Sequence, residues 1–130
     1  DVTFKTESHY PVKKKLIQEA ITKHLYKQVH RNTEVGVTIV GNRRMRQLNR
    51  DFRKLDKTTD VLSFPLNDPS FKPTAPFIDP PDDVLRLGDI VVSYPQVVVE
   101  AAEENKLVDA KLIELVLHGL DHLLGIHHPE

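Results

Sequence analysis

The sequence predicts one α+β domain, covering residues 1–130, in which a mixed four-stranded sheet packs with helices. Two observations lead to this prediction. A chain of 130 residues is long enough to bury one hydrophobic core. Segments with the two-residue period of strands and the 3.6-residue period of helices follow each other in the order β-α-β-α-β-β-α-α. This order is typical of an α+β or α/β sandwich with a mixed sheet.

The first three elements follow from local patterns. Val2 and Phe4 alternate with polar residues, which indicates a short strand. Apolar residues then recur every three or four positions from Pro11 to Val29, as in an amphipathic helix with proline in its first turn. Residues Glu34–Val40 are β-branched and alternating, so we expect a second strand there.

The next element is an arginine-rich helix. We expect Gly41 to end the strand and Asn42 to cap the helix. The helix should bury one apolar stripe and leave most of its arginines on the opposite side. Between Gly41 and Lys57 there are seven basic and two acidic side chains, although the whole chain has a formal charge of −1. The stripe consists of Met45, Leu48, Phe52 and Leu55.

The second half of the chain supplies two strands and two helices. Val61–Leu66 is a short apolar run that contains proline, which favours an edge strand. A proline-rich loop is expected over Asn67–Asp83. Leu87–Ser93 is apolar enough for an inner strand. The helices are expected from Pro95 to about Glu104 and from Asp109 to Leu124.

Composition narrows the function classes. Cysteine is absent, which excludes disulfides and cysteine-based zinc or redox chemistry. The sequence contains no run of 18 apolar residues, which a membrane-spanning helix would need. We therefore expect a soluble, cytoplasmic protein with no membrane partner. The net charge argues against a uniformly basic nucleic-acid binder and leaves a local basic surface as the alternative.

The stretch HGLDHLLGIHH predicts a metal site. His118 and His122 lie one turn apart on a helix, and Gly125 ends that helix. The chain can then turn back and bring a third imidazole to the same ion, either His128 or its rival His127. We favour His128, because it keeps the spacing of zinc peptidases. Three histidines around one Zn²⁺ leave a fourth position open, which is typical of catalytic sites.

The general base of a zinc peptidase is missing. Gly119 occupies the position where such an enzyme carries glutamate. Zinc still lowers the pKa of bound water to about 7, so the pattern favours a hydrolase whose leaving group needs no protonation by that glutamate. A phosphodiester meets this condition better than a peptide. Glu114 and Asp121 are further acidic residues near the histidines that could orient a ligand, but such residues are more often solvated, so we leave both out of the predicted site.

Three blocks together resemble the YbeY family of endoribonucleases, which are also described as ribosomal RNA maturation factors. HGLDHLLGIHH is similar to the family signature H-G-x-L-H-L-x-G-Y-D-H, with Asp121 in place of leucine and His127 in place of aspartate. The other two blocks are TTDVLSFP, at residues 58–65, and LGDIVVS, at residues 87–93.

The resemblance implies a zinc-dependent, single-strand-specific endoribonuclease that acts in small-subunit ribosomal RNA maturation and ribosome quality control. It places one zinc ion on His118, His122 and His128 and a functional arginine at Arg53. The implied partners are single-stranded RNA, especially ribosomal RNA, and proteins of the small ribosomal subunit. Water and the RNA 2′-hydroxyl both remain possible nucleophiles. The alternatives are a zinc metallopeptidase-like hydrolase and a non-catalytic ribosome assembly factor with a structural metal.

Arg53 also has a claim that does not depend on the resemblance. It ends the arginine-rich helix, and its planar guanidinium could donate two hydrogen bonds to a phosphate. Spacing alone would favour a solvated surface arginine, and the family resemblance reverses that preference. We treat five other basic residues as weaker phosphate contacts and three phenylalanines as candidates for stacking on an unpaired base, with Phe64 expected in the core. The former are Arg43, Arg44, Arg46, Arg50 and Lys54, and the latter Phe64, Phe71 and Phe77.

Overall fold

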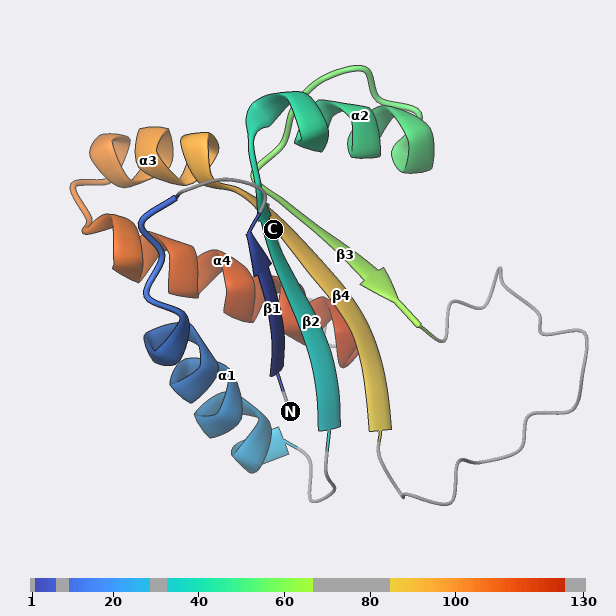
Figure 1. Ribbon diagram of the computed structural model, residues 1–130, viewed down its shortest axis with the longest axis vertical. Coiled ribbons are helices and arrows are strands. Elements are labelled where there is room, and N and C mark those ends of the chain that lie inside the picture. The colour runs from blue at the N-terminus through green and yellow to red at the C-terminus, as the bar shows by residue number, and fades with distance from the viewer. Residues whose placement is uncertain (1, 7–9, 29–32, 67–84, 126–130) are drawn as a thin grey trace, which may run out of the picture.

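The computed structural model describes residues 2–6, 10–28, 33–66 and 85–125, and it confirms the α+β class (Figure 1). Strands and helices follow in the predicted order. None of the helices in these ranges is long and apolar enough to cross a lipid bilayer. The elements are β1 (Val2–Thr6), α1 (Lys14–Gln28), β2 (Thr33–Val40), α2 (Asn42–Arg53), β3 (Val61–Pro65), β4 (Leu85–Ser93), α3 (Tyr94–Glu103) and α4 (Val108–Leu123).

The sheet has four strands in the order β1-β2-β4-β3. β1, β2 and β4 are parallel, whereas β3 runs antiparallel to β4 at one edge. The edge position of β3 suits its terminal proline, because Pro65 has no N–H to donate to a further strand. β4 lies inside the sheet, where residues such as Ile90 and Val92 are completely buried.

One face of the sheet carries the main core. In Figure 1, α1 and α4 lie side by side along this face. Ile17 and Ile21 of α1 pack with Leu112 and Leu120 of α4 against the buried side chains of β2 and β4. Because every second strand residue points to the same face, β2 contributes Val35, Val37 and Ile39.

Helix α2 covers part of the opposite face with a smaller apolar cluster. Met45 is completely buried there against Val40, Leu62 and Val91. The predicted stripe is wrong at its far end, since Phe52 is 65% exposed and Leu55 lies beyond the end of the helix, partly exposed. In the last turn of α2, Phe52 contacts β3 only through the edge of an aromatic pair with Phe64, with ring centroids 5.2 Å apart, and most of its surface stays open.

Two predictions about helix starts are wrong. α1 begins at Lys14, because the N–H of Val12 bonds the carbonyl of Tyr10 at 2.8 Å and makes a turn before the helix. The N-cap of α2 is Gly41 rather than Asn42. The Asn42 side-chain oxygen accepts a hydrogen bond from the hydroxyl of Ser93 at 2.8 Å instead, which ties α2 to the end of β4. The predicted loop over residues 67–83 lies outside the described residues.

Candidate active site

A cleft of about 580 Å³ lies between α4 and the edge strand β3. Its walls come from segments that are far apart in the sequence. Helix α2 contributes Arg53, and α3 contributes Glu100. The remaining lining residues are Thr59, Asp60, Val61, Leu62 and Ser63 around β3, and Lys111, Glu114, Leu115, His118, Gly119 and His122 of α4.

The structure brings two predicted metal ligands together in this cleft. His118 and His122 are exposed residues of α4, and their ring centroids are 4.5 Å apart with 57° between the ring planes. Two histidines that bind one zinc ion each place a nitrogen about 2.0–2.1 Å from it. Rings that are neighbours on one helical face and open into the same cleft are suited to this arrangement.

The third predicted ligand is not part of the described structure. His128 and its rival His127 both lie outside the described residues. Helix α4 ends where the sequence predicts, since Gly125 follows the C-cap residue Leu124 with a φ of +81°, a conformation that glycine adopts readily. In the described ranges, no group of three histidine or acidic side chains is placed to hold a metal ion.

Gly119 explains why the glutamate of zinc peptidases is absent. Gly119 is buried where α4 packs on the sheet, and a β-carbon built there would be 2.9 Å from Cγ2 of Ile90 and 3.4 Å from Cγ2 of Val61. Carbon atoms in ordinary contact are about 3.5–4.0 Å apart. The helix approaches the sheet so closely that a side chain at this position would force either Ile90 or α4 to shift.

Arg53 lines the same cleft as the histidines. It is exposed, and no carboxylate pairs with its guanidinium in the described part of the chain. Other arginines of α2 differ in this respect. Arg46 binds Asp56 at 2.8 Å, and Arg50 lies 3.6 Å from Asp51. The guanidinium of Arg53 therefore remains available for an anionic ligand.

Sequence reasoning missed a charged network on the wall of the cleft. The Lys111 ammonium is only 8% exposed and lies 2.7 Å from Glu104, 3.3 Å from Glu114 and 3.8 Å from Glu100. Burial alone would lower the pKa of Lys111, but hydrogen bonds with Glu104 and Glu114 outweigh it and leave the pKa raised. Glu114 therefore binds lysine, in a structural role.

Glu100 is the most perturbed carboxyl group of the cleft. Burial, followed by the neighbouring charge of Asp60, raises the pKa of Glu100 from 4.5 to about 7 despite the nearby Lys111. Asp60 has a structural role as well, since its carboxylate accepts a hydrogen bond from the N–H of Val61 at 2.7 Å. No local pattern in the sequence marks Glu100, because its partners come from α4 and from the segment before β3.

Comparison with known proteins identifies the family. The model of the family Endoribonuclease YbeY matches residues 2–130. The chain belongs to this family. The resemblance drawn from the three sequence blocks is thus confirmed.

Curated members of the YbeY family match most of the chain. The Endoribonuclease YbeY of Dehalococcoides mccartyi strain BAV1 is 40% identical over 102 residues, which cover 76% of this chain and 64% of that protein. The Endoribonuclease YbeY of Roseiflexus sp. strain RS-1 is 40% identical over 114 residues, or 87% of this chain and 69% of that protein. The chain thus spans about two thirds or less of the length of several of these relatives.

A solved structure supports the fold. The solution structure of TM1509 from Thermotoga maritima aligns with a TM-score of 0.63 and 27% sequence identity. The alignment covers 99% of this chain and 75% of that one. The architecture described above is therefore shared over nearly the whole chain.

Asp121, one departure from the YbeY signature, acts away from the cleft. It is 8% exposed, and its carboxylate lies 2.6 Å from Nε2 of His24 on α1. Asp121 lies on the face of α4 that packs on α1, whereas His118 and His122 line the cleft. Asp121 therefore connects two helices, and this contact gives it a structural role.

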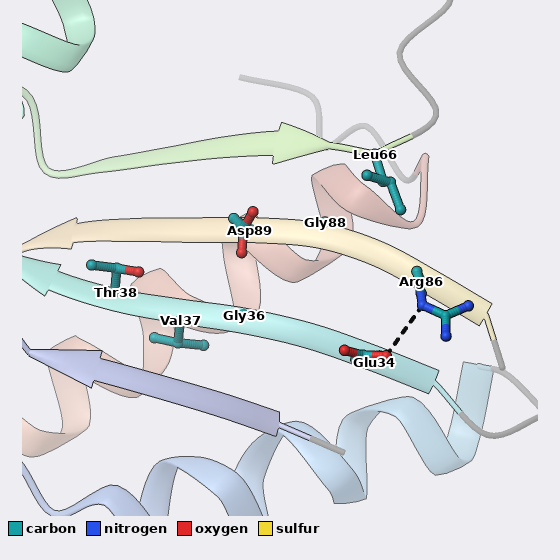
Figure 2. Close-up of a pocket in the computed structure, with 8 residues that line it drawn as sticks. All are labelled: Glu34, Gly36, Val37, Thr38, Leu66, Arg86, Gly88 and Asp89. Carbon is teal, nitrogen blue, oxygen red and sulfur yellow. Dashed lines mark ion pairs between the residues drawn. The ribbon is translucent and has the colours of Figure 1, made fainter. Parts of the chain in front are cut away.

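The aspartate of the LGDIVVS block lies in a different hollow. Figure 2 shows this hollow, of about 290 Å³, on the face of β2 and β4 opposite α1 and α4. Asp89 lies over Gly36, where no side chain obstructs its carboxylate, and Arg86 pairs with Glu34 at 3.4 Å. The sheet separates Asp89 from the histidine-lined cleft, so we assign it no part in a metal site.

Proposed function

We propose that this protein is a zinc-dependent endoribonuclease that cleaves single-stranded RNA. The observation that carries the proposal is the convergence of Arg53, His118 and His122 on one cleft. At least 64 positions of sequence separate Arg53 from either histidine, so the fold rather than proximity along the chain brings them together. Membership of the YbeY family, whose curated members carry the name endoribonuclease, supports the same activity.

We assign one zinc ion to His118, His122 and His128. The two described histidines fit such an ion, because they present imidazole rings from one helical face to an open cleft. When bound, zinc would supply a Lewis acid for a phosphoryl oxygen or for water. His128 completes the set by its spacing, and His127 is the alternative donor.

The residues of the chain would bind and orient the RNA phosphate. The Arg53 guanidinium can donate two parallel hydrogen bonds to non-bridging phosphate oxygens and stabilise charge that develops on them. The Lys111 network holds the wall of the cleft but is engaged with glutamates, so it does not compete with Arg53 for the phosphate. Helix α2 adds a positive surface whose contacts would be independent of RNA sequence.

We further propose ribosomal RNA as the substrate, in maturation and quality control of the small subunit in the cytoplasm. Small-subunit ribosomal proteins would be the neighbouring partners. Support comes from the family resemblance of the three sequence blocks. The residues 2–130 would act as a single domain, since the family match extends over all of them.

The central test compares cleavage of an unpaired oligoribonucleotide by the wild type, His122→Ala and Arg53→Ala. Lys23→Ala is the control, because Lys23 is an exposed cation on α1 that does not line the cleft. We expect His122→Ala to lose zinc and cleavage. Arg53→Ala should retain zinc and lose about 10²–10³-fold in rate, as when one oxyanion-stabilising donor is removed.

Elemental analysis and circular dichroism of each variant separate loss of metal from loss of fold. Cleavage by Arg53→Ala at the wild-type rate would refute the role of Arg53. An unchanged zinc content in His122→Ala would refute the assignment of that ligand. A folded wild type that binds RNA without cleaving it would indicate an assembly factor, and casein hydrolysis would indicate a peptidase.

A further inference from the structure

A second hollow adjoins the cleft on the other side of the edge strand. It has a volume of about 510 Å³ and lies between the end of α2 and β3. Arg53, Leu62 and Ser63 line both this hollow and the cleft, so the two adjoin along β3, which lies between them. We call it the aromatic hollow, and its other lining residues are Phe52, Phe64, Pro65, Leu66 and Asp89.

Phe52 presents an exposed aromatic surface in the aromatic hollow. Its ring meets that of Phe64 edge to face, with centroids 5.2 Å apart and 67° between the planes. An edge-to-face contact uses only one face of one of the two rings. Because 65% of Phe52 is exposed, a flat group can still stack on it. The contact with Phe64 holds the ring in place beforehand, which reduces the entropy lost on binding.

The charges around the aromatic hollow select the kind of ligand and its orientation. Arg53 lies at the boundary with the cleft, and no carboxylate pairs with it in the described ranges. Asp89 lines the aromatic hollow and repels a phosphate from it. An RNA chain would therefore place its phosphate at Arg53 and its base on the phenylalanine side. Asp89 could then accept a hydrogen bond from an amino group of the base.

We propose that the aromatic hollow binds one unpaired nucleobase by stacking on Phe52, next to the phosphate held by Arg53. The proposal rests on the proposed ribonuclease function and extends it by a subsite. A stacked base would require a single strand, because a paired base does not leave its helix to reach the ring. Specificity for unpaired RNA would thus arise beside the reacting phosphate, on an element other than the histidine helix.

The experiment measures the affinity of the full chain for two oligonucleotides of equal length by fluorescence anisotropy. One is 2′-O-methyl oligoadenylate, which resists cleavage, and the other is its abasic counterpart with the same backbone. The variants are Phe52→Leu, which removes the aromatic face, and Phe52→Trp, which keeps one. Tyr26→Leu on α1 is the control, because Tyr26 is 82% exposed and lies on a helix that does not line the cleft.

We expect Phe52→Leu to weaken binding of oligoadenylate about tenfold, as for loss of one stacked base, and to leave abasic binding unchanged. Phe52→Trp should bind oligoadenylate at least as well as the wild type, and Tyr26→Leu should bind normally. Equal losses on both oligonucleotides, or no loss on either, would overturn the subsite. If unmodified RNA is cleaved nonetheless, only the subsite is refuted. A wild type that neither binds nor cleaves RNA refutes both proposals.

Discussion

Replacing Gly119 with alanine tests whether close packing of α4 on the sheet excludes a side chain at the peptidase position. The added β-carbon would be 2.9 Å from Cγ2 of Ile90, which is itself completely buried. This is about 0.9 Å shorter than a normal contact of about 3.8 Å. Adding a methyl group to a packed core costs about 1–3 kcal/mol. Alanine recovers about 1 kcal/mol of helix propensity, so we expect a net loss of about 1 kcal/mol.

A double-mutant cycle isolates the contact. Ile90→Ala removes Cγ2 and Cγ1 and thus the nearest obstacle, although it destabilises the protein by creating a cavity. In that background, Gly119→Ala should become stabilising by up to about 1 kcal/mol, since the helix propensity remains. The free energy of unfolding is measured by urea denaturation followed by far-ultraviolet circular dichroism.

The sign of the effect decides the outcome. A Gly119→Ala variant that is more stable than the wild type, or a coupling with Ile90 below about 0.5 kcal/mol, would show that the helix can move away from the sheet at little cost. In that case the absence of the glutamate would have no structural cause. If the packing argument holds, Gly119→Glu is more destabilising than Gly119→Ala and does not create a peptidase.

Two further predictions concern the surroundings of the cleft. The pKa of Glu100 is raised from 4.5 to about 7, so its contribution to stability is complete below pH 4.5 and is lost as the pH rises through 7, by at most about 3 kcal/mol. Glu100→Gln should flatten this dependence in urea unfolding at pH 5 and pH 8, and an unchanged slope would contradict the assignment. His24→Ala should lower stability by about 1–2 kcal/mol through loss of the bond to Asp121, and Asp121→Leu should restore most of it. RNA cleavage by the His24→Ala and Asp121→Leu variants should equal that of the wild type. A loss of cleavage as large as that of His122→Ala would place Asp121 in the site.

The sequence predicted the elements well because their hydrophobic periods agree with what the sheet buries. β3 illustrates this, since a short apolar run that ends in proline fits only an edge. Phe52 shows the limit of the same reasoning. Its spacing from Met45 and Leu48 is that of a core stripe, but periodicity gives a direction around the helix and not the extent of the surface below it. Below Phe52 the edge strand offers only Phe64, so most of the Phe52 ring stays exposed.

The candidate site was predictable where chemistry and spacing are local. His118 and His122 are neighbours on one helix, so their sequence spacing determines their proximity. Lys111 and Glu100 depend instead on how α3 packs on α4, which no local pattern records. The sequence showed that Gly119 replaces a glutamate, whereas the reason became visible only with Ile90 and Val61 beside it.

The position of β4 between β2 and β3 has a consequence for how the protein matures. Among the described strands, β3 pairs with β4 alone, although β3 precedes β4 in the chain. During synthesis, residues 61–65 therefore cannot form their strand pairing until residues 85–93 have emerged from the ribosome. The β3 wall of the cleft is assembled only then, and α4, which carries the histidines, is the last of the described elements to emerge. A growing polypeptide would thus lack the complete cleft, and with it the ribonuclease activity proposed above, until α4 has emerged.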